Sequence, residues 1–148
     1  MTLLTEHELH QHRATLTSLL DRVGEARLTD TGAEDDVRTL EAEANAPLDP
    51  PYQHAYFRYA EIYERRVSGW ELIEYYYEFQ LRPDPGRRAH HLHDPLGPHQ
   101  HCVSPTAAAE DDHFVGGLMS LFDAHRDLLY WYAQDEGLNC DGLTPLFG

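Results

Sequence analysis

Hydrophobic residues near the start of the chain recur at the spacing of a helix. Those expected on its inner face are Leu9, Leu16, Leu19, Leu20 and Val23. This spacing of three, four and seven residues predicts an amphipathic helix. Thr5 and Glu8 precede it as a capping box, in which the threonine hydroxyl accepts from the backbone at Glu8 and the glutamate side chain reaches back. We expect the helix to end at Gly24 or in the loop of residues 29–32.

A second, weaker helical pattern follows and predicts a helix over residues 33–45. Its apolar side would consist of Val37, Leu40 and Ala44. Residues 5–45 would then be an N-terminal helical extension, which a proline-rich breaker at residues 47–51 separates from the rest of the chain. The first helix also carries three histidines that we interpret as solvated surface residues, namely His7, His10 and His12.

From residue 52 onward the chain is dense in aromatic and β-branched residues, which favour strands. We expect one strand over residues 55–66 and, after a Ser-Gly turn, a second over residues 71–81. Polar and apolar positions alternate along the second strand, and its inner face would consist of Ile73, Tyr75, Tyr77, Phe79 and Leu81. A tight Pro-Asp-Pro-Gly turn at residues 83–86 then returns the chain, so residues 52–103 form an antiparallel meander of about three to five strands.

The strongest helical pattern lies near the C-terminus. Its apolar positions are Phe114, Leu118, Leu121, Phe122, Leu128, Leu129 and Tyr132. Ser104 and Pro105 would begin this helix and Gly137 would stop it, which predicts one long helix over residues 105–136. We expect His125, on its apolar face, to be a hydrogen-bonded core histidine. The predicted fold is α+β: a single domain with N-terminal helices, an antiparallel β-sheet meander and a long C-terminal helix packed on the sheet.

Composition and charge add a constraint on partners. The chain has 148 residues, enough for one domain with a core, and a formal net charge of -15 from eleven basic and twenty-six acidic side chains. The acids are spread from Glu6 to Asp141, which favours adaptation to a very salty cytoplasm over binding to a basic partner. At ~1 M salt the Debye length is only about 3 Å, so the acidity weakens a nucleic-acid hypothesis without excluding it.

The two cysteines, Cys102 and Cys140, suggest neither a disulfide framework nor a Cys-x-x-Cys metal knuckle. The first eight residues lack the basic and apolar regions of a signal peptide. No apolar run approaches the ~18 residues that span a bilayer. These features predict a soluble cytoplasmic protein with no membrane contact.

Residues 87–102 concentrate the chemistry of the chain, because five of its eleven histidines fall there beside two arginines and an aspartate. Imidazole, guanidinium and carboxylate groups on one small surface suit either metal ligation or acid/base chemistry on a phosphodiester. If residues 87–93 and 99–103 are strands, their side chains alternate between two faces. That alternation puts His91 with His93, puts His99 with His101, and turns His90 to the opposite face.

Four short motifs follow one another in the middle of the chain: Ala60-Glu61-Ile62-Tyr63, Tyr75-Tyr76-Tyr77, His93-Asp94 and Pro98-His99-Gln100-His101. In this order, with a predicted C-terminal helix after them, they resemble the TumE family of toxins from bacterial and archaeal toxin–antitoxin pairs. The chain differs from that family in lacking its usual Asn-Ala and paired-histidine segment after the aspartate. The resemblance covers about residues 55–132. It implies a toxin whose target is RNA and whose partner is a cognate, folded antitoxin.

The first functional hypothesis is an RNA-cleaving toxin that uses histidine acid/base chemistry without a cofactor. Cleavage next to a 2′-hydroxyl needs a base, an acid and a cation for the developing phosphorane charge. Free imidazole, with a pKa of about 6.5, suits either proton-transfer role. The residues assigned to these roles are His99 and His101 as base and acid, His91 or His93 as substitutes, Arg87 or Arg88 on the phosphate, Glu61 or Asp94 as orienting carboxylates, and Tyr75 and Tyr77 as base-stacking or sheet-packing rings.

The second hypothesis is a site for a divalent transition metal such as zinc. A His-x-His segment on a strand puts two imidazoles on one face, and a carboxylate can complete the site. The candidate ligands are His91, His93, His99 and His101, with Asp94 nearby.

The third hypothesis is a protein without enzymatic activity that binds a partner, or a second copy of itself, through its amphipathic helices. In that case the histidines would be solvated or would sense pH. Five histidines scattered over separate surfaces would favour this hypothesis over the other two.

Overall fold

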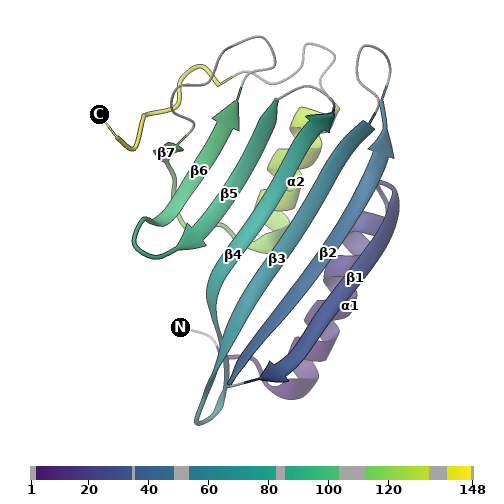
Figure 1. Cartoon of the computed structure of the whole chain (residues 1–148), viewed down its shortest axis with the longest axis vertical. Helices are drawn as coiled ribbons and strands as arrows, with labels where there is room; N and C mark the ends of the chain where they lie inside the picture. Colours follow the sequence, from purple (N-terminus) through teal and green to yellow (C-terminus); the bar gives the residue numbers. More distant parts are fainter. Residues whose placement is uncertain are drawn as a thin grey trace.

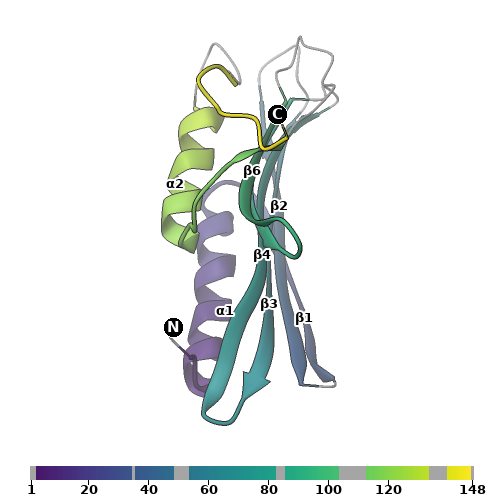
Figure 2. The same ribbon diagram turned by 90° about the vertical axis from the view of Figure 1, so that its left-hand side faces the viewer.

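The computed structural model describes residues 3–34, 36–48, 54–82, 86–103, 113–133 and 140–147. Within this part of the chain, seven antiparallel strands form one sheet in chain order, and both helices lie on the same face of it (Figure 1, Figure 2). The elements are α1 (Glu6–Asp21), β1 (Glu25–Glu34), β2 (Val37–Pro47), β3 (His54–Arg66), β4 (Gly69–Arg82), β5 (Arg87–His93), β6 (Gly97–Val103), β7 (His113–Val115) and α2 (Leu121–Tyr132). The predicted α+β class with an antiparallel meander is confirmed, but the C-terminal helix is short, with 12 residues.

The N-terminal helix begins where the capping box predicts. The backbone N of Glu8 donates to Thr5 Oγ1 at 3.1 Å, and the backbone N of Thr5 donates to Glu8 Oε1 at 3.2 Å. Leu9, Leu16 and Leu20 are fully buried, so the predicted apolar face is confirmed. Full burial of a leucine side chain stabilises a fold by about 1.5–3 kcal/mol. These leucines therefore hold α1 on the sheet, over β1 and β2.

The chain between α1 and β3 forms two strands, so the predicted helix over residues 33–45 is wrong. In β2, burial alternates residue by residue, which is the period of a strand. Its buried residues are Leu40, Ala42, Ala44 and Ala46. Three of these four are alanines, which have the highest helix propensity and little hydrophobic contrast, and so the alternation is weak in the sequence. The N-terminal helical extension is thus one helix followed by two strands.

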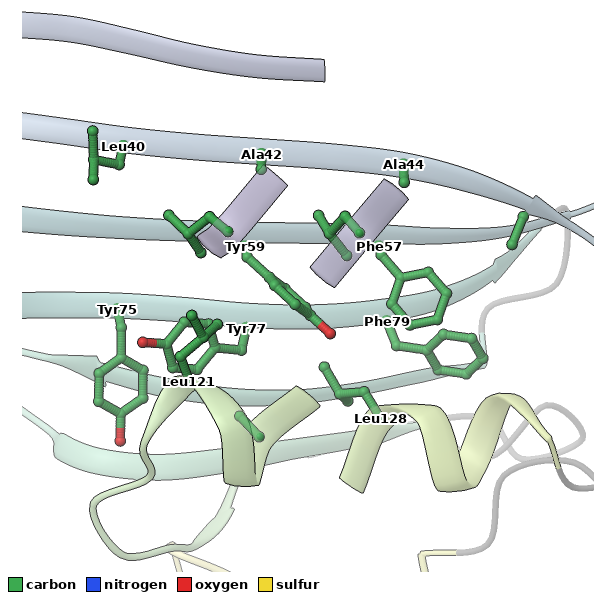
Figure 3. Packing of buried hydrophobic residues seen from close by; sticks show 14 of the residues in the cluster. Leu40, Ala42, Ala44, Phe57, Tyr59, Tyr75, Tyr77, Phe79, Leu121 and Leu128 are labelled. Carbon is green, nitrogen blue, oxygen red and sulfur yellow. The ribbon is translucent and has the colours of Figure 1, made fainter. Parts of the chain in front are cut away.

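The central strands β3 and β4 follow the predicted alternation with one shift. Their inward-facing aromatic residues make the centre of the core (Figure 3), and they include Phe57, Tyr59, Tyr75, Tyr77 and Phe79. The pairing of the two strands shifts between Ile62 and Tyr63, which leaves Ile73 as an extra residue in β4. Leu72, rather than Ile73, therefore packs against the core. Such a bulge reverses which side chains point inward on either side of it.

The region predicted as one helix over residues 105–136 contains a strand, an irregular segment and then a helix. Two consecutive glycines, Gly116 and Gly117, follow β7, and each disfavours a helix by about 1 kcal/mol relative to alanine. The helix α2 begins only after Ser120, whose hydroxyl oxygen accepts from the backbone N of Asp123 at 3.1 Å.

Within α2, His125 is buried and shares a hydrogen bond of 2.7 Å with the Tyr59 hydroxyl, so the predicted core histidine is confirmed. Two members of the predicted apolar stripe lie elsewhere: Phe114 is in β7, and Leu118 precedes the helix and is 75% exposed.

Several predicted features fall outside the described residues: most of the breaker at residues 47–51, most of the turn at residues 83–86, the cap formed by Ser104 and Pro105, and the stop at Gly137.

Cys102 and Cys140 form a disulfide, so the expectation that these cysteines make no disulfide is wrong. A pair separated by 38 residues has no diagnostic spacing, and only the fold brings the two together. Among the helices described, none has the length and apolar character needed to cross a membrane.

Candidate metal centre on the open face of the sheet

Five histidines from β5, β6 and β7 gather on the sheet face opposite the helices. We call His91, His93, His99, His101 and His113 the five-histidine cluster. The strand register makes them neighbours, because His91 pairs with His99 across β5 and β6, and His101 pairs with His113 across β6 and β7. His90, as predicted, points to the other face, where its Nε2 donates to Asp127 of α2 at 2.7 Å. The predicted grouping of His91 with His93 and of His99 with His101 is therefore confirmed.

The rings of the cluster are close enough to act on one ligand. Their centroids lie 4.3 Å apart for His91 and His101, 4.4 Å for His101 and His113, and 4.6 Å for His93 and His99. Two sets of three residues each have all their ligand nitrogens within 4.8 Å of one another. The outer set is His91, His93 and His99, and the inner set is His99, His101 and His113. His99 is common to both sets.

Hydrogen bonds to backbone carbonyls fix the tautomers of two cluster members. His99 Nδ1 donates to the Gly97 carbonyl oxygen at 2.8 Å, and His93 Nδ1 donates to the Asp94 carbonyl oxygen at 3.1 Å. A carbonyl oxygen can only accept, so each Nδ1 carries a proton and each neutral ring keeps its lone pair on Nε2. In metal sites, a ligating histidine commonly donates its other ring N–H to such a carbonyl. His99 Nε2 is buried and has no hydrogen-bond partner among the described residues.

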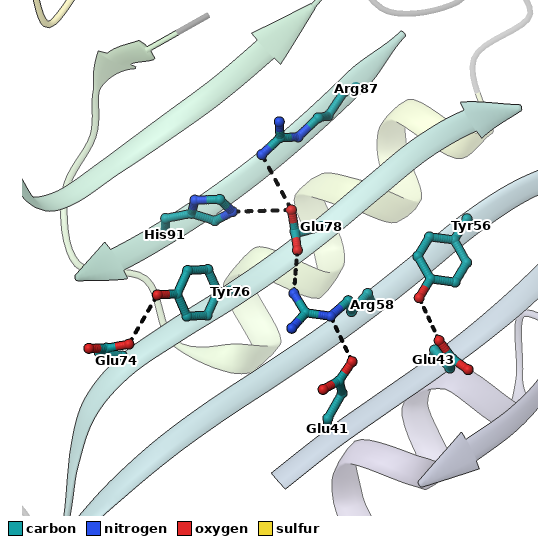
Figure 4. A network of polar contacts seen from close by, with 9 residues as sticks. All are labelled: Glu41, Glu43, Tyr56, Arg58, Glu74, Tyr76, Glu78, Arg87 and His91. Atoms are coloured by element: carbon teal, nitrogen blue, oxygen red, sulfur yellow. Dashed lines mark hydrogen bonds and ion pairs between the residues drawn. The ribbon is translucent and has the colours of Figure 1, made fainter. Parts of the chain in front are cut away.

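A series of ion pairs between charged side chains crosses the sheet and ends at His91 (Figure 4). Glu78 Oε2 lies 3.3 Å from His91 Nε2 and 3.3 Å from an Arg87 nitrogen, while Glu78 Oε1 accepts from Arg58 at 2.7 Å. Burial would raise the pKa of the Glu78 carboxyl, but His91 and the two arginines together lower it to about 2. The carboxylate therefore stays ionised and accepts hydrogen bonds. If His91 carries its proton on Nε2, facing this carboxylate, the lone pair of the neutral ring lies on Nδ1.

Burial keeps the central imidazoles neutral. It lowers the pKa of His91 against the opposing effect of Glu78, and it lowers the pKa of His99 against that of the Gly97 carbonyl. The charges that neighbouring histidines would carry lower the pKa of His99 further. At neutral pH both rings thus present lone pairs, which is the form that binds metals or acts as a general base.

Several residues that the sequence assigned to this site lie elsewhere. The Arg88 side chain is on the helix face, where its Nε donates to Asp127 at 3.2 Å. Tyr75 and Tyr77 are 2% and 1% exposed and stack on each other in the core, which is the packing interpretation of these rings. Asp94 accepts from His93 through its backbone carbonyl. Among the assigned side chains outside the cluster, that of Arg87 reaches the histidines, through Glu78.

Glu61 belongs to a separate buried network under α1. Its carboxylate is 1% exposed and accepts from the hydroxyls of Tyr63 and Tyr77 at 3.0 and 2.5 Å. His12 Nε2 completes the network at 2.6 Å from Glu61 Oε1, so this histidine is not the solvated surface residue that the sequence suggested. Burial, followed by the negative charge of Glu61, raises the pKa of both tyrosines.

Sequence reasoning missed His113 and Glu78. His113 falls inside the helix predicted over residues 105–136, whereas it lies in a three-residue strand that pairs with the histidine strand β6. The signal that could have found it is the pair of glycines just beyond, because they separate residues 113–115 from any helix. Gly116 also lies against β6: a Cβ there would come within 3.0 Å of the His99 backbone carbon.

Comparisons with protein-family models, with curated proteins and with solved structures find no match to this chain. The resemblance to TumE toxins therefore stays a prediction from short motifs.

Proposed function

We propose that the protein binds a divalent transition-metal ion of the zinc class through the five-histidine cluster. The observation that carries this proposal is the buried, unpaired Nε2 of His99, an atom of the one residue common to both ligand sets. A buried polar atom left without a partner costs about 1–3 kcal/mol. A metal ion bound at Nε2 removes that cost and uses the tautomer that the Gly97 carbonyl already holds.

The donor set indicates the class of metal. Imidazole nitrogens suit zinc, copper, iron and nickel, whereas calcium and magnesium take oxygen ligands. A zinc ion held at 2.0–2.1 Å by tetrahedral ligands needs nitrogens about 3.4 Å apart. Ligand nitrogens within 4.8 Å of one another meet that spacing after small side-chain rotations. Three histidines leave a fourth position for water, which is the composition of catalytic zinc sites.

Metal analysis of protein purified without a histidine tag tests this proposal directly. We expect about one equivalent of zinc, nickel or copper per chain after loading and desalting, because His99 belongs to both ligand sets and its neutral ring has one nitrogen lone pair, which binds one ion. A cobalt-loaded sample should show the visible absorption of a tetrahedral Co²⁺ site. Less than about half an equivalent, with no cobalt spectrum, would contradict metal binding.

A second candidate function is RNA cleavage by a toxin that a cognate antitoxin neutralises. The observation in its favour is the contact chain from Arg87 through Glu78 to His91, which supplies a guanidinium next to neutral imidazoles. In this function His99 and His101 exchange protons with the 2′-hydroxyl and the leaving oxygen, while Arg87 binds the phosphate.

RNA cleavage in the presence of a chelator distinguishes the two functions. If the histidines act as acid and base, purified protein should cleave RNA in excess EDTA, and a His99→Ala/His101→Ala variant should lose about 100-fold or more of the rate, since each proton transfer contributes at least that much. Growth arrest on expression should disappear in the same variant. Arrest that persists in the double variant would remove this assignment.

A further inference from the structure

The position of His113 depends on the C-terminal part of the chain. We call residues 140–147 the C-terminal clamp; it lies beside β7 (Figure 1, Figure 2). The backbone N of Val115 donates to the Thr144 carbonyl oxygen at 2.8 Å, and the backbone N of Leu146 donates to the His113 carbonyl oxygen at 3.0 Å. The ring of Phe147 lies 5.6 Å from that of His113. The clamp thus binds the edge of β7 that faces away from β6.

The strand β7 is too short to be stable without such support. It has three residues, and it pairs with β6 at three positions. Strands of this length sit at the lower limit of those found in sheets, so the three pairs with β6 hold this edge strand weakly. The disulfide from Cys102 to Cys140 fixes the start of the clamp to β6, one residue after His101. A covalent bond therefore limits how far the clamp, and with it His113, can move.

The two ligand sets differ in their dependence on this bond. The inner set includes His113 and so requires the clamp. The outer set lies entirely on the β5–β6 hairpin, where two of its rings donate to that hairpin's own carbonyls, at Asp94 and Gly97. The cysteine sulfur itself is not a candidate ligand, because Cys102 pairs with Arg88 in the sheet and points to the helix face.

We propose that the Cys102–Cys140 disulfide is a redox modification site that determines whether His113 takes part in metal binding. The proposal rests on the proposed metal-binding function. In the oxidised protein the clamp holds β7, and the inner set is complete. In the reduced protein the clamp is released, His113 leaves, and the ion is held by the outer set alone with lower affinity.

The chemical class of the reactant follows from the bond that breaks. A cellular dithiol attacks Cys140, which is half-buried, while Cys102 is buried and leaves as the thiolate. The second thiol of the reductant then displaces Cys140. The reductant's two thiols become one disulfide, the two electrons pass to the two cysteine sulfurs, and the two protons end on the new thiols. Where disulfides occur in cytosolic proteins, they are usually transient and either catalytic or redox-sensing.

The first arm of the test measures zinc affinity, by competition with a chromogenic chelator. We call the protein without the disulfide the open state. Because a dithiol reductant would itself bind zinc, the open state is prepared in two other ways: as the Cys102→Ser/Cys140→Ser variant, and as wild type reduced with a phosphine that is then removed. We expect affinity to fall about tenfold or more in both, and His113→Ala in the oxidised protein to weaken binding equally. In the double serine variant, His113→Ala should add almost nothing, whereas His93→Ala should weaken binding further.

The second arm measures hydrogen exchange in protein without metal. The amides of Val115 and Leu146 should exchange faster once the disulfide is absent, while that of Leu40 in β2 should not change, which also verifies that the variant is folded. Oxidised wild type that binds no zinc would defeat the proposed function. Oxidised protein that binds zinc, together with an open state of equal affinity or unchanged exchange at Val115 and Leu146, would overturn the redox proposal alone.

Discussion

Replacing His99 by alanine is expected to abolish stoichiometric zinc binding. His99 belongs to both the outer and the inner set, so its loss leaves each set with two histidines. Loss of a supporting hydrogen bond alone weakens metal sites 10–100-fold, and loss of a shared ligand should exceed about 100-fold. The measurement is zinc affinity by chelator competition, with His7→Ala as the matched control, because His7 is an exposed histidine on α1.

Thermal denaturation provides a second measurement of the same prediction. Zinc at 100 times its dissociation constant stabilises a folded protein by about 2.7 kcal/mol, which corresponds to a rise of about 5–10 °C in Tm for a chain of this size. We expect that rise in wild type and in His7→Ala, and none in His99→Ala. The comparison uses the shift that zinc causes in each protein, since removing a buried ring also lowers stability without metal. An equal zinc-induced shift in His99→Ala would contradict the proposed centre.

Replacing Glu61 by alanine is expected to lower the free energy of unfolding by about 2–6 kcal/mol, because each of two buried hydroxyls left without a partner costs about 1–3 kcal/mol. The carboxylate accepts from Tyr63, Tyr77 and His12, so its removal leaves two tyrosine hydroxyls without a partner and detaches α1 from β3. Urea denaturation followed by circular dichroism measures the change. Of all the substitutions considered, this one should destabilise the fold most.

The matched control for Glu61 is Glu64→Ala in the same strand. Glu64 is 43% exposed and pairs with Arg66 at 2.7 Å, and exposed ion pairs of this kind contribute about 0–1 kcal/mol. If both alanine variants lose the same small amount of stability, the buried network does not hold the helix to the sheet. Glu61→Gln should fall between them, because the amide keeps one acceptor oxygen for the tyrosines.

The sequence predicted the histidine strands well because their chemistry and their period agree. The register of residues 87–93 and 99–103 contains no bulge, so successive side chains point to opposite faces of the sheet. The face of each histidine therefore followed from strand geometry alone. The same reasoning failed for β2, where alanine at the inward positions resembles a helical sequence. In general, the pattern is informative where inward and outward residues differ strongly in polarity, as in β4, and weak where the inward residues are small.

The parts of the site that sequence reasoning missed depend on contacts between distant segments. His113 joins the cluster through pairing with β6, and Glu78 reaches His91 through pairing of β4 with β5. The pairing of β6 with β7 has no periodic signal, because a strand of three residues is shorter than any period can reveal. The β4–β5 hairpin was predicted from the turn at residues 83–86, but the alternation of its residues does not give the register that brings Glu78 to His91. Likewise, Glu61 lay in a recognisable motif, but its inward direction under α1 came from the register of β3 and from packing.

The turn between β5 and β6 has a further consequence for how the protein can vary. Both acceptors that orient the outer rings are main-chain oxygens, at Asp94 and at Gly97, and Gly97 adopts a φ of 66°, which favours glycine. A side chain at position 94 can therefore be exchanged without loss of its acceptor. The hairpin thus holds the tautomers of His93 and His99 through its own main chain, whereas the third outer ring, His91, lies beside the Glu78 side chain of β4. Substitutions in the turn and substitutions at position 78 are therefore expected to affect different rings of the same set.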